Sequence, residues 1–207
     1  MDRLVSEVKS LKNTHVGDLV NQRIKEFEGI GGGESQEIFK ELCFCTLTAN
    51  FDAEKSIALQ EIVGDGFINL PPEGLEAKLR KFGYRYPNRA AYIAESRKFK
   101  NALRELVFSF EDGFRAREWL AKNVKGLGFK EASHFLRNIG FKGLAIIDFH
   151  IVDLLSREKL IEKPKTMTKK RYLEIEQVLS RLAGKLGMSL AELDLYLWYL
   201  ETGKVLK

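Results

Sequence analysis

The sequence has little cysteine and proline and lacks any long apolar run. Its 207 residues include only two cysteines and four prolines. Cys43 and Cys45 are too few for a structural zinc or iron–sulfur site, so we expect two buried thiols in a reducing compartment. No stretch of about 18 apolar residues is present, which excludes a membrane-spanning helix. The mixed-charge start, Met1 to Leu4, lacks the apolar core of a signal peptide, so we expect none.

Strand-like alternation of apolar and polar residues is also scarce. Apolar residues instead recur every three or four positions, as in Leu103, Leu106, Val107 and Phe110. This spacing is typical of amphipathic helices, and glycines and prolines separate about ten such segments. The apolar run from Gly143 to Ile147 is the one stretch that resembles a strand, and we expect it to be the entry to a helix. The sequence therefore predicts an all-α protein.

The charge balance favours no partner strongly. The chain carries 34 Lys and Arg against 29 Asp and Glu, a net charge of +5. Such a mild excess is compatible with binding to a polyanion but does not identify one. Hydrophobic residues make up 44% of the chain, enough for one large domain or two small lobes.

The most informative stretch runs from Val124 to Phe135 and predicts a helix, a tight turn and a second helix. Gly126 and Gly128 flank the turn, where glycine lets the backbone turn sharply and lets another backbone approach closely. Their amides would lie at the open N-terminus of the second helix, which is an anion site suited to a DNA phosphate. A Gly-x-Gly pair alone is usually only a turn.

A lysine and an aspartate follow the turn at a characteristic spacing. Lys130 lies two residues past Gly128, and Asp148 comes eighteen residues later, after an apolar run. Taken singly, Lys130 would be a solvated helix residue and Asp148 a helix N-cap. Together they resemble the helix-hairpin-helix DNA glycosylases, whose motif joins a Gly-hydrophobic-Gly turn, a lysine and a later aspartate. The stretch Val124-Lys125-Gly126 departs from the usual Leu-Pro-Gly opening of that motif.

The resemblance extends toward the enzymes that act on 8-oxoguanine. Residues 39 to 57 are similar to the family's first barrel helix and the loop that enters the DNA, and this implies that Asn50 faces the opposite strand. Tyr84 and Arg85 match an aromatic wedge and an arginine that reads the orphaned cytosine. From the residues alone, Tyr84 could equally be a core residue and Arg85 a surface charge.

Two missing features and the last residue indicate the branch of the family. The chain lacks the additional N-terminal β domain and the four cysteines of other branches, and it resembles the compact, archaeal-type 8-oxoguanine DNA glycosylase/AP lyases. In these a terminal lysine helps to recognise the damaged base, and Lys207 matches it. Trp198 is a candidate stacking platform for the base. A frayed terminus and a core tryptophan are the alternatives for these two residues.

The resemblance implies two helical lobes with the active-site cleft between them. We expect a six-helix barrel lobe over residues 33–147, with the helix-hairpin-helix at about 117–140. Residues 1–32 and 148–207 are expected to form the second lobe.

The implied activity has two steps. Lys130 would displace the base and form a Schiff base, which permits strand cleavage 3′ to the site by β-elimination, while Asp148 stabilises the charge that develops on the sugar. No metal or other cofactor is expected. The expected partner is double-stranded DNA with an oxidised guanine, bound by a monomer without an obligate protein partner or membrane. We expect a cytoplasmic protein, at the nucleoid when bound to DNA.

Two alternatives remain open at this point. Lys130 and Asp148 would serve equally well in an enzyme that acts on an oxidised pyrimidine or an abasic site. A helix-hairpin-helix DNA-binding protein without catalytic activity would tolerate the loss of both residues.

Overall fold

The computed structural model describes all 207 residues and contains no β-strand, which confirms the all-α prediction. The chain forms two compact units, one of residues 1–28 and 140–207 and the other of residues 29–139. The boundaries expected from the sequence, after residues 32 and 147, lie four and eight residues later than these. None of the helices is both long enough and apolar enough to cross a membrane.

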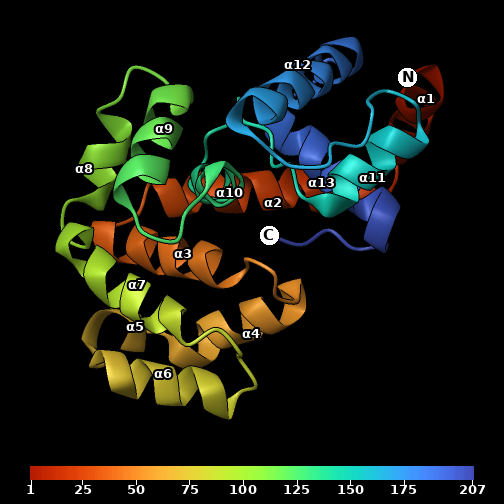
Figure 1. Cartoon of the computed structure of the whole chain (residues 1–207). Coiled ribbons are helices and arrows are strands. Elements are labelled where there is room, and N and C mark those ends of the chain that lie inside the picture. Colours follow the sequence, from red (N-terminus) through yellow and green to blue (C-terminus); the bar gives the residue numbers. More distant parts are fainter. The chain divides into compact units, whose positions relative to one another are not determined.

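The first unit combines the two ends of the chain. Its helices are most of α2 (His15–Gly31), together with α1 (Asp2–Lys12), α11 (Phe149–Arg157), α12 (Lys169–Leu186) and α13 (Leu190–Thr202). Helix α12 packs against α1 and α13, and α13 also packs against α11 (Figure 1). Leucines and other apolar residues that recur along these helices fill the interior, among them Leu4, Val8, Leu155, Leu182 and Leu195.

The second unit is built around α3 (Ser35–Leu47), which is buried along nearly its whole length. The other elements are α4 (Ala53–Val63), α5 (Gly66–Asn69), α6 (Pro72–Lys81), α7 (Asn88–Ser96), the 3-10 helix η1 (Arg97–Phe99), α8 (Leu103–Phe108), α9 (Gly113–Asn123) and α10 (Phe129–Asn138). Helices α4, α7, α8 and α10 all pack against α3 (Figure 1). Cys43 and Cys45 are free thiols buried in this core, and burial raises the pKa of Cys43.

The structure contains more helices than the ten or so that the sequence predicts. The additional elements are short, such as the four residues of α5 and the three of η1. Such elements span about one turn, so apolar periodicity cannot reveal them. The predicted N-cap of α13 is confirmed, because Ser189 accepts a hydrogen bond from the Glu192 amide and the Glu192 carboxylate accepts one from the Ser189 amide.

The apolar run before Asp148 leads into a helix, as the sequence predicts. The run Gly143 to Ile147 is an irregular segment that precedes α11, which begins at Phe149. The side chains of Leu144 to Ile147 are all buried. The segment is apolar because it crosses the interior of its unit, and its backbone bonds to side chains of α12 instead of forming a helical turn.

A buried polar network joins α10 to α3 and α4. The Asn138 amide donates to Glu41 Oε1 over 2.6 Å, and Asn138 Oδ1 accepts from Nε and Nη2 of Arg137. Gln60 donates to the second oxygen of Glu41 over 2.9 Å. Glu41, Arg137 and Asn138 are all buried, so each lost bond would leave a desolvated charge with fewer partners.

Replacing the central amide of this network is expected to destabilise the protein strongly. Asn138→Ala should lower the free energy of unfolding by about 2–4 kcal/mol, since Glu41 and Arg137 each lose a buried partner. Asn123→Ala is the matched control, because Asn123 is exposed and bonds only to the Trp119 carbonyl. Urea unfolding of both variants measures the difference, and equal losses would contradict this role of the network.

Candidate active site

The predicted hairpin is present and packs against α7. It connects α9 to α10, and Gly126 has φ +87°, a conformation that favours glycine. A Cβ atom on Gly126 would lie 2.5 Å from Tyr92 Cδ2 and 2.9 Å from Arg89 Nη1. The same Arg89 nitrogen donates to the Gly126 carbonyl over 2.9 Å. The first glycine of the motif is therefore required both by its backbone angle and by the close approach of α7.

The second glycine is the N-cap residue of α10, and its amide already has a partner. The Gly128 N–H donates to Glu131 Oε2 over 3.1 Å, while the Leu127 N–H donates to the Val124 carbonyl. A carboxylate thus occupies the helix N-terminus at which the sequence predicts a phosphate. Lys130 is the second residue of α10 and is half-buried.

A buried arginine of α9 packs against the first turn of α10. Arg117, on α9, is 1% exposed, and its guanidinium lies 4.8 Å from the centroid of the Phe129 ring. Its Nη1 atom also donates to Ser133 Oγ over 3.2 Å. Phe129 and Ser133 flank Lys130 in the sequence, so these contacts fix the turn that carries the lysine.

Asp148 stands at the start of α11 and caps it. Its Oδ1 atom accepts a hydrogen bond from the Ile151 amide over 3.0 Å, as an N-cap does. The cap uses one carboxylate oxygen only, and the side chain is half-buried. The capping role and a chemical role for Asp148 are therefore compatible.

Three aromatic rings form a row beside Asp148. Phe149 is 67% exposed, and its ring centroid lies 3.9 Å from that of His150. The His150 ring contacts Trp198 of α13 edge-on, with the centroids 4.9 Å apart. The indole Nε1 of Trp198 is buried without a hydrogen-bond partner. The predicted stacking residue thus lies in the same unit as Asp148, and so does half-buried Lys207.

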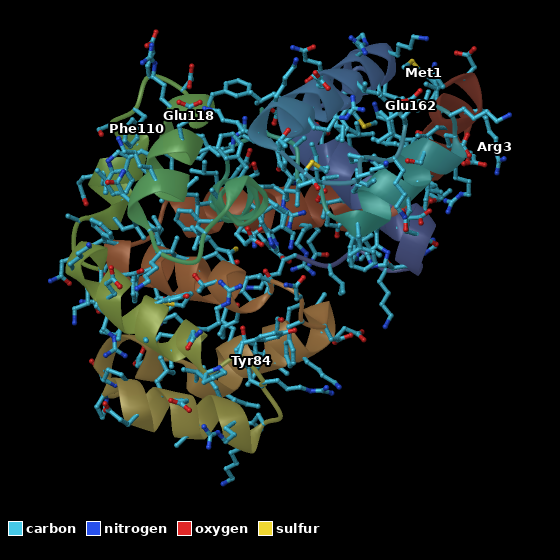
Figure 2. The ribbon with its side chains drawn as sticks, in the orientation of Figure 1. Met1, Arg3, Tyr84, Phe110, Glu118 and Glu162 are labelled. Carbon is cyan, nitrogen blue, oxygen red and sulfur yellow. The ribbon has the colours of Figure 1, made fainter.

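The residues predicted to face the opposite strand gather around α6 and α7. Tyr84 is 5% exposed, its hydroxyl donates to the Leu47 carbonyl over 3.0 Å, and burial raises its pKa. Its position beside α6 is visible in Figure 2. Tyr86 lies next to it with ring centroids 5.6 Å apart, is 38% exposed, and donates to the Asn50 carbonyl.

A groove of about 470 Å³ is lined by Tyr84, Arg85 and Tyr86, together with Glu76, Leu79, Arg80, Gly83 and Pro87. Asn50 is exposed and adopts φ +58°. The structure therefore places Tyr84 in the interior of its unit and Tyr86 at the surface. Tyr86, Arg89 and Phe149 were not predicted as site residues. The exposure of Tyr86 and Phe149 and the packing of Arg89 against the hairpin cannot be inferred from a single sequence.

The structure contains no cluster of three or more His, Cys, Asp or Glu side chains arranged to hold a metal ion. The hairpin brings Gly126, Gly128 and Lys130 together in the second unit, whereas Asp148, Trp198 and Lys207 belong to the first unit. Each unit thus carries part of the predicted set.

Comparison with known proteins covers nearly the whole chain. A family model described as 8-oxoguanine DNA glycosylase matches residues 20–188. An 8-oxoguanine DNA glycosylase/AP lyase from Korarchaeum cryptofilum is 53% identical, over 100% of this chain and 99% of the relative. A protein of the same name from Methanocaldococcus jannaschii is 50% identical, over 99% of each chain.

Solved structures agree with these sequence matches. The Methanocaldococcus jannaschii 8-oxoguanine glycosylase/lyase, in complex with a 15mer DNA that contains 8-oxoguanine, matches with a TM-score of 0.96 and 49% identity. The match covers 99% of this chain and 100% of that chain. The 8-oxoguanine DNA glycosylase of Thermotoga maritima matches with a TM-score of 0.94 and 47% identity, over all of both chains. These likenesses confirm the helix-hairpin-helix fold.

Adding one methyl group at Gly126 is expected to disturb the hairpin. Gly126→Ala should cost about 1–3 kcal/mol of stability, because φ is positive and the new Cβ meets Tyr92 and Arg89. Gly184→Ala is the control, since nothing lies within 4 Å of a Cβ atom there and Gly184 is inside α12. Thermal unfolding should show a loss for the first variant only, and two unchanged melting temperatures would refute the packing argument.

The capping role of Asp148 can be separated from the effect of its charge by two substitutions. Asp148→Asn retains a good N-cap and should leave the melting temperature close to that of the wild type, whereas Asp148→Ala should lose about 1 kcal/mol. Calorimetry of the three proteins provides the measurement. An equal loss for both variants would show that the charge, not the cap, stabilises α11.

Proposed function

The chain belongs to the helix-hairpin-helix family of 8-oxoguanine DNA glycosylases, and we propose that it excises 8-oxoguanine from duplex DNA and then cleaves the strand at the vacated site. The observation that carries this proposal is the hairpin itself. It sets Lys130 on the first turn of α10, two residues beyond a glycine at a helix N-terminus. A helix start that attracts phosphate and an amine beside it are what lysine-dependent base excision requires.

We assign the nucleophile to Lys130. Its neutral amine forms a bond to C1′ of the damaged nucleotide while the C1′–N9 bond breaks and its electron pair leaves with the base. Opening of the sugar ring then gives a Schiff base between Lys130 and the former C1′. Loss of a proton from C2′ breaks the C3′–O bond, which expels the 3′ phosphate, and water finally releases the amine.

Asp148 serves the first of these steps. As the base departs, positive charge develops on the sugar, and a carboxylate stabilises it most where its own position is fixed beforehand. The bond from the Ile151 amide to Oδ1 fixes the Asp148 side chain and leaves the second oxygen for the sugar. The same carboxylate can accept or pass a proton during elimination.

The remaining predicted residues would bind the DNA around the lesion. We propose that the Gly126–Gly128 hairpin holds a phosphate and that Asn50 and Arg85 face the opposite strand. Tyr84 was expected to be the aromatic wedge. Tyr86 lies beside it, is exposed, and presents the more accessible ring for that role. Trp198 and Lys207 would recognise the extruded base by stacking and through the chain terminus.

The proposed enzyme is a monomer that works without a metal, another cofactor or an obligate protein partner. We place it in the cytoplasm, at the nucleoid while bound to DNA. Because the hairpin contacts phosphate rather than base edges, its affinity for undamaged DNA should be independent of sequence and should fall with rising salt.

Borohydride trapping tests the nucleophile and the substrate together. A duplex with 8-oxoguanine opposite cytosine should give a covalent adduct with the wild-type protein, since borohydride reduces the Schiff base. Lys130→Gln should give none, because no amine remains at that position. Undamaged duplex is the control for the lesion, and Lys125→Gln, which changes an exposed lysine of the same hairpin, is the control for the charge.

The outcomes separate the candidate functions. An adduct that needs both the lesion and Lys130 supports the proposal. An adduct formed only on an oxidised pyrimidine or an abasic site would retain the mechanism and replace the substrate. Binding of duplex DNA without any adduct would leave a non-catalytic helix-hairpin-helix protein and would contradict the proposal.

A further inference from the structure

The segment that leads into Asp148 has no regular secondary structure, although it is buried. Residues 141–148 form neither helix nor strand, and Leu144, Ala145, Ile146 and Ile147 are each at most 7% exposed. Buried backbone N–H and C=O groups need hydrogen-bond partners. For residues 145 and 147 these partners are side chains.

Two side chains of α12 supply these partners. Glu176 Oε1 accepts a hydrogen bond from the Ala145 N–H over 2.9 Å. The Tyr172 hydroxyl donates to the Ala145 carbonyl over 2.7 Å and accepts from the Ile147 N–H at 3.3 Å. Tyr172 and Glu176 are 2% and 4% exposed and lie one helical turn apart, so both face the segment from the same side of α12.

The beginning of the segment is held separately. The Lys142 carbonyl accepts from the Ala191 amide at the start of α13, and the Lys142 ammonium pairs with Glu28 of α2 over 2.6 Å. These contacts leave the last three residues before Asp148 dependent on Tyr172 and Glu176. The hydrogen bond from the Ile151 amide of α11 then fixes the Asp148 carboxylate.

We propose that Tyr172 and Glu176 are positioning residues for Asp148 and together form a clamp on residues 145–147. This inference rests on the catalytic role of Asp148 given under the proposed function. The Tyr172 hydroxyl both donates and accepts, so it bridges two backbone groups that are two residues apart. Without it, the Ile147 amide loses its partner and the backbone next to Asp148 gains freedom.

The decisive variant is Tyr172→Phe, which removes one oxygen and keeps the buried ring. A small displacement of a reacting group is costly in rate, so single-turnover excision of 8-oxoguanine should slow by about tenfold. The dissociation constant for the same duplex should change by less than about twofold, because Tyr172 is buried and its side chain is not available to contact DNA. Tyr196→Phe is the matched control, a tyrosine of the same unit that makes no hydrogen bond to residues 145–147.

A double variant distinguishes positioning from general stability. If Tyr172 acts through Asp148, then Tyr172→Phe should slow the wild type but should have no further effect in the Asp148→Asn background. A loss that arises only from weaker folding would appear equally in both backgrounds. Glu176→Gln, which retains an acceptor for the Ala145 amide, should retain more activity than Glu176→Met.

Hydrogen exchange of the Ile147 amide supplies a readout that does not require activity. The exchange should accelerate in Tyr172→Phe and remain unchanged in Tyr196→Phe. An unaltered excision rate in Tyr172→Phe, an additive loss with Asp148→Asn, or unchanged exchange at Ile147 would each overturn the clamp. A wild-type protein that excises nothing would instead overturn the proposed function, while the exchange result would still report on the clamp.

Discussion

The hydrogen bonds that begin helices α10 and α11 determine the positions of the two side chains proposed to react, Lys130 and Asp148. Lys130 lies on the first turn of α10, whose start is held by the bond between Gly128 and Glu131 and by packing of Phe129 on Arg117. Asp148 is itself the N-cap of α11. A helix start is a rigid location with a fixed direction, so a side chain there needs little reorganisation before it reacts.

The parts of the site that were predictable from sequence are those that depend on local interactions. The two glycines, the lysine and the capping aspartate act within a few residues of their own positions, so their spacing alone indicates the hairpin and both helix starts. The all-α fold follows from apolar periodicity for the same reason.

The parts that were missed depend on contacts between distant residues. The run before Asp148 was expected to lead into a helix, but its apolar character says nothing of Tyr172 and Glu176, which lie about 30 positions later and satisfy its backbone. Tyr84 looks the same in sequence whether it is a wedge or a core residue. Its burial follows from a bond to the Leu47 carbonyl, 37 positions away, and from the neighbouring ring of Phe51.

The bond between Gly128 and Glu131 has a consequence for the way in which an anion arrives at the hairpin. The Gly128 amide already has an acceptor, because the Glu131 carboxylate of the same helix bonds to it. Binding of the proposed phosphate at this amide would thus exchange one negatively charged ligand for another. Glu131 would leave the amide when a phosphate binds and return to it when the phosphate departs, so the helix start would have an anionic partner in both states.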